Sequence, residues 1–297
     1  MRVRFPPSAH SPFSSKHFCI HYCCMFATLF TIGPFSLQTL SVFMVLSFLV
    51  SSFVFWRKGR EEHYSEAQLF DGFLTSLIFG YIASRLAYVI FHFEQFGWEI
   101  WKWFDIVHLP GVLPGVGLLA STLAIARFAH GKKWDVFEIL DFWVLAMSVG
   151  MVLTYIGYFF DGSLFGLPTS LPWGMVFPGV FERHHPVQLY SALFYAILFF
   201  FLHRVEYSYR SFEWYRGGKK TAQTGFLLCV NLVLHGIFAL GMSFVQLPEL
   251  VFGTIAIDRW VYGAEILIGI WLLLLRSGRI GNRPVRRPTL ASLLEHD

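Results

Sequence analysis

Long apolar runs are the feature that most constrains how this chain can fold. Each run is close to the ~20 residues that an α-helix needs to cross the hydrocarbon core of a bilayer. The seven runs cover residues 35–56, 69–93, 110–129, 136–159, 186–203, 224–246 and 255–275. Only 14% of the residues are charged, whereas soluble domains average about 25%. We therefore predict an all-α integral membrane protein with seven transmembrane helices.

The distribution of lysine and arginine predicts which way these helices run. Basic residues are frequent in the connections after the first, third and fifth runs and in the C-terminal tail, whereas the second and fourth connections carry only Lys102 and Arg183. Basic connections remain preferentially on the cytoplasmic side of a membrane. We therefore expect the C-terminus to be cytoplasmic and the N-terminus to lie outside.

The two ends of the chain differ from its apolar centre. Residues 1–24 are basic and interrupted by proline. We interpret them as a start site assigned too early, with Met25 as the true start, or as a disordered extension. Residues 25–276 form the predicted membrane domain, and residues 277–297 form a basic cytoplasmic tail. The net charge of +4 comes from loops and ends, so it reports topology, and we expect no nucleic-acid partner.

A group of cysteines and histidines near the N-terminus resembles a metal site only superficially. It comprises His17, Cys19, His21, Cys23 and Cys24. The second half of a zinc-binding pattern does not follow these residues. We therefore expect neither a metal ion nor another cofactor.

Polar side chains gather in the stretch Pro172–Tyr190, just before the fifth apolar run. Its last eight residues include Arg183, His184, His185, Gln188 and Tyr190. Polar groups where a membrane helix begins are functional candidates, although Trp, Tyr, Arg and His also anchor helices at the lipid headgroups. His185 precedes Pro186, which favours an extended backbone before the helix. Because histidine titrates near neutral pH, His185 is the candidate general base.

Other polar residues are predicted to lie in the outer half of the membrane. They are Arg85 on the second run and Tyr155, Tyr158 and Asp161 at the end of the fourth, whereas His235 lies deeper, midway along the sixth. Placing Arg85 there costs about 2.5–3.5 kcal/mol on an insertion scale. Its guanidinium either reaches the headgroups or holds a lipid phosphate. His235 either forms a hydrogen bond between helices or contacts a substrate.

Two further groups of residues have structural interpretations beside functional ones. The glycines of residues 111–117 either let helices approach closely or expose backbone amides to an anion. Asp71, Glu138 and Asp141 lie near the predicted cytoplasmic helix ends, where we expect water to surround them.

The order of several motifs resembles the prolipoprotein diacylglyceryl transferase family across residues 32–276. Residues 33–34 (Gly-Pro) stand ahead of the first helix, and residues 80–88 (Gly-Tyr-Ile-Ala-Ser-Arg-Leu-Ala-Tyr) are similar to the family's second-helix pattern. Residues 161–178 are similar to its Asn-Gly-Glu-Leu-Tyr-Gly…Pro-Trp-Gly-x-x-Phe-Pro run, and residues 185–190 to its His-Pro-Ser-Gln-Leu-Tyr. These last two motifs, adjacent and in order, are the most specific part of the resemblance.

The chain also departs from the family pattern at positions that carry charge or polarity. The replacements are Gly115 for a histidine, Tyr155 for an arginine, Tyr158 for an asparagine, Ser163 and Ser243 for glutamates, and Ala239 for a second arginine. Neutral hydroxyls do not replace the charge of a guanidinium. The loss of charge-assisted contacts costs binding energy unless other groups compensate.

The resemblance implies transfer of a diacylglyceryl group from phosphatidylglycerol to the lipobox cysteine of exported prolipoproteins at the bacterial cytoplasmic (inner) membrane. The implied partners are phosphatidylglycerol, the prolipoprotein signal peptide with its lipobox cysteine, and membrane lipid. His185 is the implied catalytic residue. The expected substrate- and lipid-binding residues are Arg85, Tyr155, Tyr158, Asp161, Arg183, Gln188, Tyr190 and His235.

An alternative follows from the replaced positions. A non-catalytic member of the same family would bind lipid or lipoprotein signal segments without turnover, because function depends on the site and not on the fold. A transporter or channel is disfavoured, since it would place polar groups at the midplane or in both leaflets, whereas the polar residues here are predicted on one side.

Overall fold

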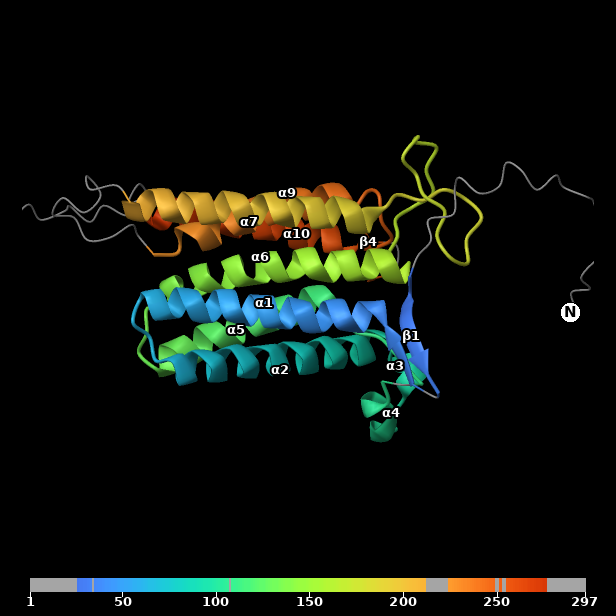
Figure 1. Cartoon of the computed structure of the whole chain (residues 1–297), viewed down its shortest axis with the longest axis horizontal. Helices are drawn as coiled ribbons and strands as arrows, with labels where there is room; N and C mark the ends of the chain where they lie inside the picture. Colours follow the sequence, from blue (N-terminus) through green and yellow to red (C-terminus); the bar gives the residue numbers. More distant parts are fainter. Residues whose placement is uncertain are drawn as a thin grey trace, which may run out of the picture.

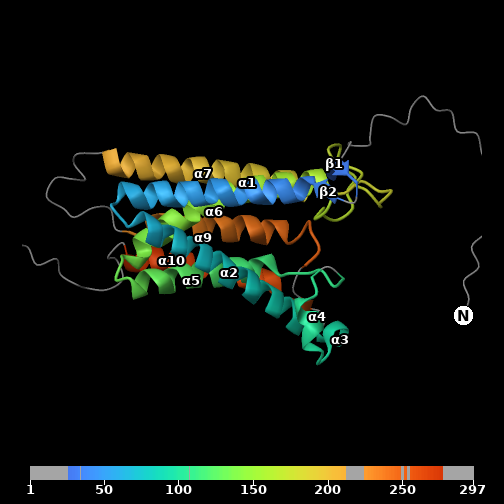
Figure 2. The ribbon, with the colours of Figure 1, turned by 60° about the horizontal axis from the view of Figure 1, so that its bottom comes forward.

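The fold is a bundle of long helices that lie side by side (Figures 1 and 2). In this computed structural model, the described residues are 26–33, 35–106, 108–211, 224–248, 251–252 and 255–276. The N-terminal segment 1–24, with its cysteines and histidines, and the tail 277–297 lie outside them.

Each of the seven apolar runs contains one long helix. These helices are α1 (Thr39–Glu61), α2 (Glu66–Phe91), α5 (Pro114–Gly131), α6 (Val136–Asp161), α7 (Val187–Ser211), α9 (Phe226–Met242) and α10 (Ile257–Arg276). Within the described ranges, four segments are long and apolar enough to cross a membrane: α1, α2, α6 and residues Val187–Tyr207 of α7. Two short helices, α3 (Phe93–Phe96) and α4 (Ile100–Phe104), connect α2 to α5.

The prediction of an all-α fold was wrong in one respect, because short strands are also present. The antiparallel pair β1 (Thr28–Ile32) and β2 (Phe35–Gln38) precedes α1, and the pair β3 (Val251–Phe252) and β4 (Ile255–Ala256) precedes α10. Gly33 lies between β1 and β2 with φ +59°, a conformation that glycine adopts without steric cost. The β1 segment is rich in β-branched and aromatic residues, a signal that counting apolar residues does not detect.

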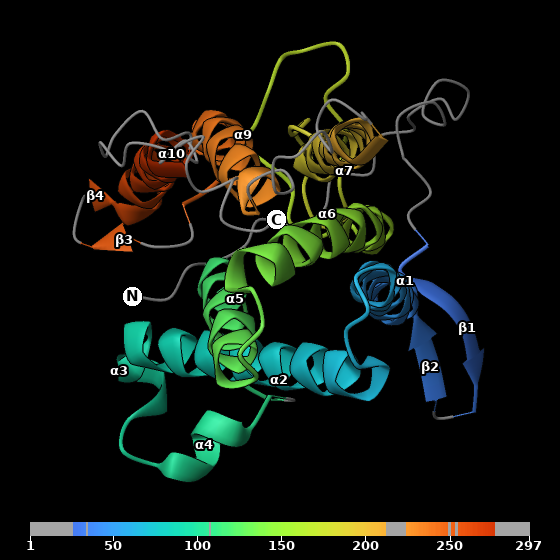
Figure 3. The same ribbon diagram turned by 90° about the vertical axis from the view of Figure 1, so that its left-hand side faces the viewer.

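Helix α6 lies at the centre of the bundle, as the view along the helices shows (Figure 3). It packs against α1, α5, α7 and α9, while α2 pairs with α5 and α9 pairs with α10. Trp143 of α6 is only 1% exposed, and its ring lies 6.0 Å from that of Phe55 and 5.6 Å from that of Phe73. A helix that is apolar on all sides, as α6 is, is covered by neighbours.

Successive long helices run in opposite directions, so alternate connections meet at the same end. One end carries β1, β2, α3, α4, residues 162–186 and β4 (Figure 1). We call it the loop end. All residues of the Pro172–Tyr190 stretch except those that enter α7 lie in its connections.

The end opposite the loop end is held by polar contacts between helices. Lys58 of α1 and Glu206 of α7, both more than 90% buried, form an ion pair of 2.8 Å. Between α1 and α2, the hydroxyl of Tyr64 donates a hydrogen bond of 2.5 Å to Glu138 of α6. Burial, together with this hydrogen bond, raises the pKa of Tyr64 above its usual range. These contacts tie α1 to α7, and the connection between α1 and α2 to α6.

Asp141 joins α6 to the start of α9. Its carboxylate accepts hydrogen bonds from the backbone N–H groups of Gly225 (2.7 Å) and Leu228 (2.8 Å). Free N–H groups at a helix start favour such an anionic partner. The expectation that water alone surrounds Glu138 and Asp141 was therefore wrong, because both have protein partners.

Small residues bring α2 and α5 into close contact. Gly72, Ser76, Gly80 and Ser84 recur every four residues along α2, a spacing that lets helices approach. A Cβ at Gly80 would lie 2.7 Å from the carbonyl oxygen of Gly117 on α5. Because that oxygen belongs to the backbone, it cannot turn aside as a side chain can. Of the two interpretations of the glycine-rich run, the contact supports close packing for Gly117.

We expect Gly80→Ala to lower the free energy of unfolding by about 1–3 kcal/mol, because the added methyl group overpacks the α2–α5 contact. Gly263→Ala in α10 is a matched control, since nothing lies within 4 Å of the added Cβ, and alanine favours a helix over glycine. Unfolding in sodium dodecyl sulfate, followed by tryptophan fluorescence, gives both values. Equal stability of the two variants would contradict the close-packing account.

Candidate functional site

Residues 162–186 connect α6 to α7 at the loop end and form a compact, hydrogen-bonded loop. The N–H of Thr169 donates to the carbonyl of Arg183 (2.7 Å), and His184 and Met175 exchange backbone hydrogen bonds of 2.8 and 3.0 Å. The imidazole Nδ1 of His184 lies 2.7 Å from a carbonyl oxygen of the same loop. His184 and the backbone of Arg183 therefore hold the loop together, and the half-buried Arg183 side chain lies at the loop end.

Gly166 fixes this loop against the end of α9. Its N–H donates to the carbonyl of His185 (2.9 Å), and the N–H of Leu167 donates to the carbonyl of Val245 (2.7 Å). A Cβ at Gly166 would lie 2.4 Å from the Val245 oxygen and 2.9 Å from the Cβ of His185. Only glycine fits there without rearrangement, so the backbone places His185 at the junction of the loop with α9.

Three of the predicted site residues lie together at the start of α7. The hydroxyl of Tyr190 accepts a hydrogen bond of 2.8 Å from the indole N–H of Trp173 and lies 3.5 Å from Nδ1 of His185. Gln188 is fully buried, and its Nε2 donates to the carbonyl of Ser163 at 2.6 Å. Its Oε1 has no hydrogen-bond partner among the described residues. A buried amide oxygen without a partner is an acceptor for a polar ligand.

A second group of polar side chains lies inside the bundle. We call it the inner polar cluster, and it consists of Tyr155 of α6, Tyr195 of α7, His235 of α9, and Tyr262 and Glu265 of α10. The rings of Tyr155 and Tyr195 stack at 5.6 Å, and that of Tyr195 lies 6.0 Å from His235. Nδ1 of His235 lies 2.8 Å from Oε1 of Glu265. The contact supports the interpretation that His235 forms a hydrogen bond between helices.

The members of the inner polar cluster lie at similar depth. Tyr155, Tyr195, His235 and Glu265 are six to eight residues from the loop-side ends of their helices, which corresponds to about 9–12 Å at 1.5 Å per residue. The side chains of His235 and Glu265 are 18% and 19% exposed. An ionisable pair within apolar helices is a functional candidate, because such groups are costly there.

One buried face of α7 connects the two groups. Gln188, Ser191 and Tyr195 follow a helical spacing of three and four residues, and they are 0%, 2% and 7% exposed. Tyr158 extends the inner polar cluster along α6 toward the loop end, with its ring 6.3 Å from that of Tyr155. We take the loop-end residues and the inner polar cluster, which this face of α7 joins, together as the candidate site. Asp161, the half-buried last residue of α6, lies at its loop-end margin.

Arg85 lies apart from this region and holds the connection between α2 and α5. Its Nε, Nη1 and Nη2 donate to the carbonyls of Trp103 (3.0 Å), Gly111 (2.8 Å) and Asp105 (3.1 Å). The residue is 5% exposed, and its guanidinium carbon lies 5.0 Å from the ring centre of Phe96. Helices α5 and α6 separate α2 from α9 and α10 (Figure 3). The described contacts of Arg85 therefore support neither a guanidinium that reaches the lipid headgroups nor one that lies beside His185.

Sequence reasoning missed two charged residues near the candidate site. Glu265 could have been singled out, because it is a carboxylate within the apolar run 255–275. Its contact with His235 could not have been predicted, because no local sequence pattern relates the two helices. Arg259, in the first turn of α10, donates from Nη2 to the carbonyl of Ser243 at 3.3 Å. Ser243 lies two residues before Val245, which contacts the 162–186 loop.

Comparisons with known proteins agree with this arrangement of motifs. Residues 27–275 match the profile of the family described as "Prolipoprotein diacylglyceryl transferase". A protein from Nitratidesulfovibrio vulgaris named phosphatidylglycerol–prolipoprotein diacylglyceryl transferase is 28% identical over 263 residues, which cover 84% of this chain and 92% of that protein.

Two other relatives carry the same name. The protein from Wolbachia pipientis wMel is 31% identical over 237 residues, covering 77% of this chain and 85% of its own length. The protein from Thermotoga maritima is 25% identical over 263 residues, covering 84% and 85%. The prediction from the sequence motifs is confirmed: the chain belongs to the prolipoprotein diacylglyceryl transferase family.

Proposed function

We propose that this protein transfers the diacylglyceryl group of phosphatidylglycerol to the lipobox cysteine of exported prolipoproteins. The names of its relatives support this activity. The observation that carries the proposal is the candidate site, in which His185, Gln188 and Tyr190 continue into the inner polar cluster. A polar region of this size inside apolar helices is costly and marks a place of function.

The proposed reaction needs a base and stabilisation of an anion. A cysteine thiolate attacks the glyceryl carbon that bears the phosphate oxygen, so a carbon–sulfur bond forms while the carbon–oxygen bond breaks. Glycerol phosphate leaves with the bonding electron pair. The thiol proton passes to a base on the protein and then to the leaving phosphate. Cationic or hydrogen-bonding groups at the phosphate lower the barrier as its charge develops.

His185 is the proposed proton acceptor. The Gly166 contacts fix its backbone, and the Tyr190 hydroxyl approaches Nδ1, so we assign Nε2 to the thiol. Gln188 accepts a hydrogen bond from the substrate through Oε1. Tyr155 and Tyr158 supply hydroxyls to the headgroup, at the positions where the family pattern has an arginine and an asparagine.

Arg183 and Arg259 are the proposed phosphate contacts. Both lie at the loop end, one in the 162–186 loop and the other beside the end of α9. A guanidinium matches phosphate with two parallel N–H donors. Arg85, which the sequence assigned to phosphate, is instead assigned to the scaffold, because three carbonyl groups already accept from it.

The proposed membrane arrangement has all seven long helices crossing the bilayer. Helices α5, α9 and α10 then join the four strongly apolar segments. The basic connections support an N-terminus outside and a C-terminus in the cytoplasm, and we propose residues 25–276 as the membrane domain. In the bacterial cytoplasmic membrane, this orientation puts the candidate site in the outer leaflet, where exported prolipoproteins arrive.

Membranes that contain the protein should transfer label from phosphatidylglycerol to the cysteine of a lipobox peptide, and a peptide with serine in place of that cysteine should remain unlabelled. His185→Gln should lower kcat by about 10²–10⁴-fold, the usual contribution of general base catalysis. His108→Gln is the control, since His108 is an exposed histidine at the loop end. Failure of the unmodified chain to transfer label, where a relative succeeds, would exclude the enzyme and favour lipid binding without turnover.

Arg85→Ala should lower the free energy of unfolding by about 2–4 kcal/mol, because three carbonyls lose a charged donor. Hydrogen exchange should rise at the described amides of residues 103–111. Arg183→Ala is the comparison: it should keep the stability of the parent chain and raise KM for phosphatidylglycerol. If Arg85→Ala retains full stability and weakens only substrate binding, Arg85 is a phosphate contact after all.

Glu265→Gln should raise KM for phosphatidylglycerol about tenfold with a smaller change in kcat, because His235 loses the carboxylate that orients its ring in the binding site. The substitution preserves size and a hydrogen-bonding group, so the fold should persist. Glu94→Gln removes an exposed carboxylate from α3 at the same end and should change neither constant. Steady-state kinetics with varied lipid would refute this role if the two variants behave alike.

A further inference from the structure

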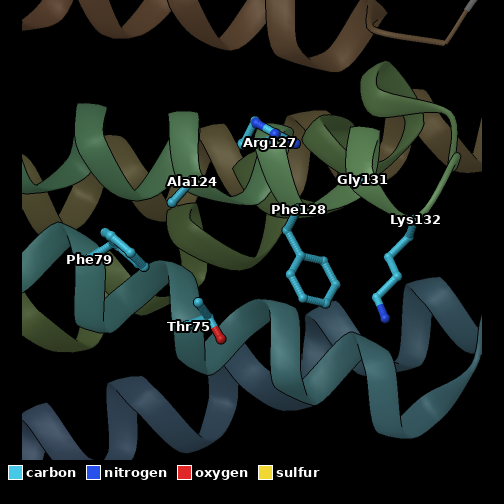
Figure 4. Close-up of a pocket in the computed structure, with 7 residues that line it drawn as sticks. All are labelled: Thr75, Phe79, Ala124, Arg127, Phe128, Gly131 and Lys132. Atoms are coloured by element: carbon cyan, nitrogen blue, oxygen red, sulfur yellow. The ribbon is translucent and has the colours of Figure 1, made fainter.

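A groove between α2 and α5 lies outside the candidate site. It runs from the middle of α2 to the end of α5 that is opposite the loop end, and it encloses about 510 Å³ (Figure 4). Its wall includes Thr75 and Phe79 of α2 and Ala124, Arg127, Phe128 and Lys132 of α5. The groove opens on the outer surface of the bundle, since Phe79 is 59% exposed and Thr75 is also exposed.

The groove changes from apolar to cationic along its length. Phe79 and Ala124 line its middle, Arg127 and Phe128 follow, and Lys132 lies at its far end (Figure 4). In Figure 4, Phe128 and Lys132 both point from α5 toward α2. The ammonium nitrogen of Lys132 lies 5.6 Å from the ring centre of Phe128. A phospholipid has the same order of chemistry, with an acyl chain followed by a phosphate.

The two cations of the groove differ from other cations at the same end of the bundle in their described partners. Among the residues that the structure describes, neither Arg127 nor Lys132 forms an ion pair with a carboxylate. At the same end of the bundle, by contrast, Arg57 pairs with Glu61 at 3.2 Å and Arg60 with a glutamate of α2 at 3.5 Å. The groove wall contains no acidic side chain.

The helix dipole explains part of this pattern and leaves part unexplained. Cations are favoured near the last turn of a helix, and Arg127 lies four residues before the end of α5. Its Nη1 lies 3.6 Å from the position of a Cβ on Gly131, so the guanidinium extends toward the helix end. The dipole does not account for a second cation beside a cavity with apolar walls.

We infer that the α2–α5 groove binds an anionic phospholipid. The phosphate lies between Arg127 and Lys132, and an acyl chain follows Phe128, Ala124 and Phe79. Basic pockets between membrane helices recognise anionic headgroups by the same combination of charge and apolar wall. The inference does not rest on the proposed transferase activity, because this lipid is a bound structural ligand at the opposite end from the candidate site.

A photo-reactive phosphatidylglycerol, with a diazirine in its acyl chain, tests the site directly. The full chain in nanodiscs should be labelled within residues 75–79 and 124–132, and a phosphatidylcholine with the same reactive chain should label these residues several-fold less. Equal labelling by the two lipids would mean that only bulk lipid fills the groove, and it would overturn the inference. This comparison uses the unmodified chain, so it does not depend on the folding of a variant.

The double variant Arg127→Gln/Lys132→Gln tests the charges. In detergent, native mass spectrometry should show about 10- to 30-fold weaker retention of a second phosphatidylglycerol, while the first, at the candidate site, and phosphatidylcholine are retained as on the parent chain. Phosphatidylglycerol should raise the unfolding temperature of the parent chain, since a ligand of the folded state stabilises it, and this rise should be smaller in the variant, where only the candidate site still binds the lipid.

The matched control is Arg57→Gln/Arg60→Gln, which removes two cations from the same end that already pair with glutamates. It should retain phosphatidylglycerol like the parent chain. Equal loss in both double variants would show a general charge effect and overturn the site. Loss only in Arg127→Gln/Lys132→Gln would establish the groove as the binding site.

Discussion

Water is absent from the hydrocarbon core of a membrane, so every polar group inside this bundle must find its partner within the protein. Most of the described groups do. The hydroxyls of Ser76 and Ser148 donate to carbonyls of their own helices at 2.6 and 2.7 Å, and the indole N–H of Trp143 donates to Thr122 at 3.0 Å. Against this background, the buried amide oxygen of Gln188 is conspicuous because it has no partner in the described part of the chain. The same rule that stabilises the bundle thus makes Gln188 a candidate contact for a ligand.

The same constraint explains why the helices were predictable. Long apolar runs separated by charged connections have few other ways to satisfy their backbone, and each run contains a helix. The boundaries were less accurate. Helix α5 begins at Pro114 and not at residue 110. Before it, the carbonyl of Gly111 accepts a hydrogen bond from Arg85, and the N–H of Leu113 donates to the carbonyl of Ser84. Such long-range contacts leave no trace in local composition.

The candidate site was only partly predictable for a related reason. His185, Gln188 and Tyr190 belong to one linear motif, so the sequence showed them together. The inner polar cluster is assembled from four helices, and the pair His235–Glu265 spans 30 residues of chain. Identifying His235 did not identify its partner, because the rotation of α9 against α10 depends on packing. Arg85 was identified as unusual because a charged residue in a membrane helix costs free energy. Its contacts could not be predicted, because its carbonyl partners lie 18 to 26 residues away in the chain.

The three carbonyl partners of Arg85 affect how relatives of this chain should be sorted. We expect a guanidinium that ties one connection to its helix to stabilise the fold, whether or not the protein turns over substrate. On the proposed scaffold role, an arginine at this position indicates the conformation of the α2–α5 connection and does not indicate activity. Homologues that have lost activity would still keep the arginine. Residues that face the unpartnered oxygen of Gln188 would differ among these homologues. Active and inactive relatives should therefore be compared at the residues of the candidate site and not at Arg85.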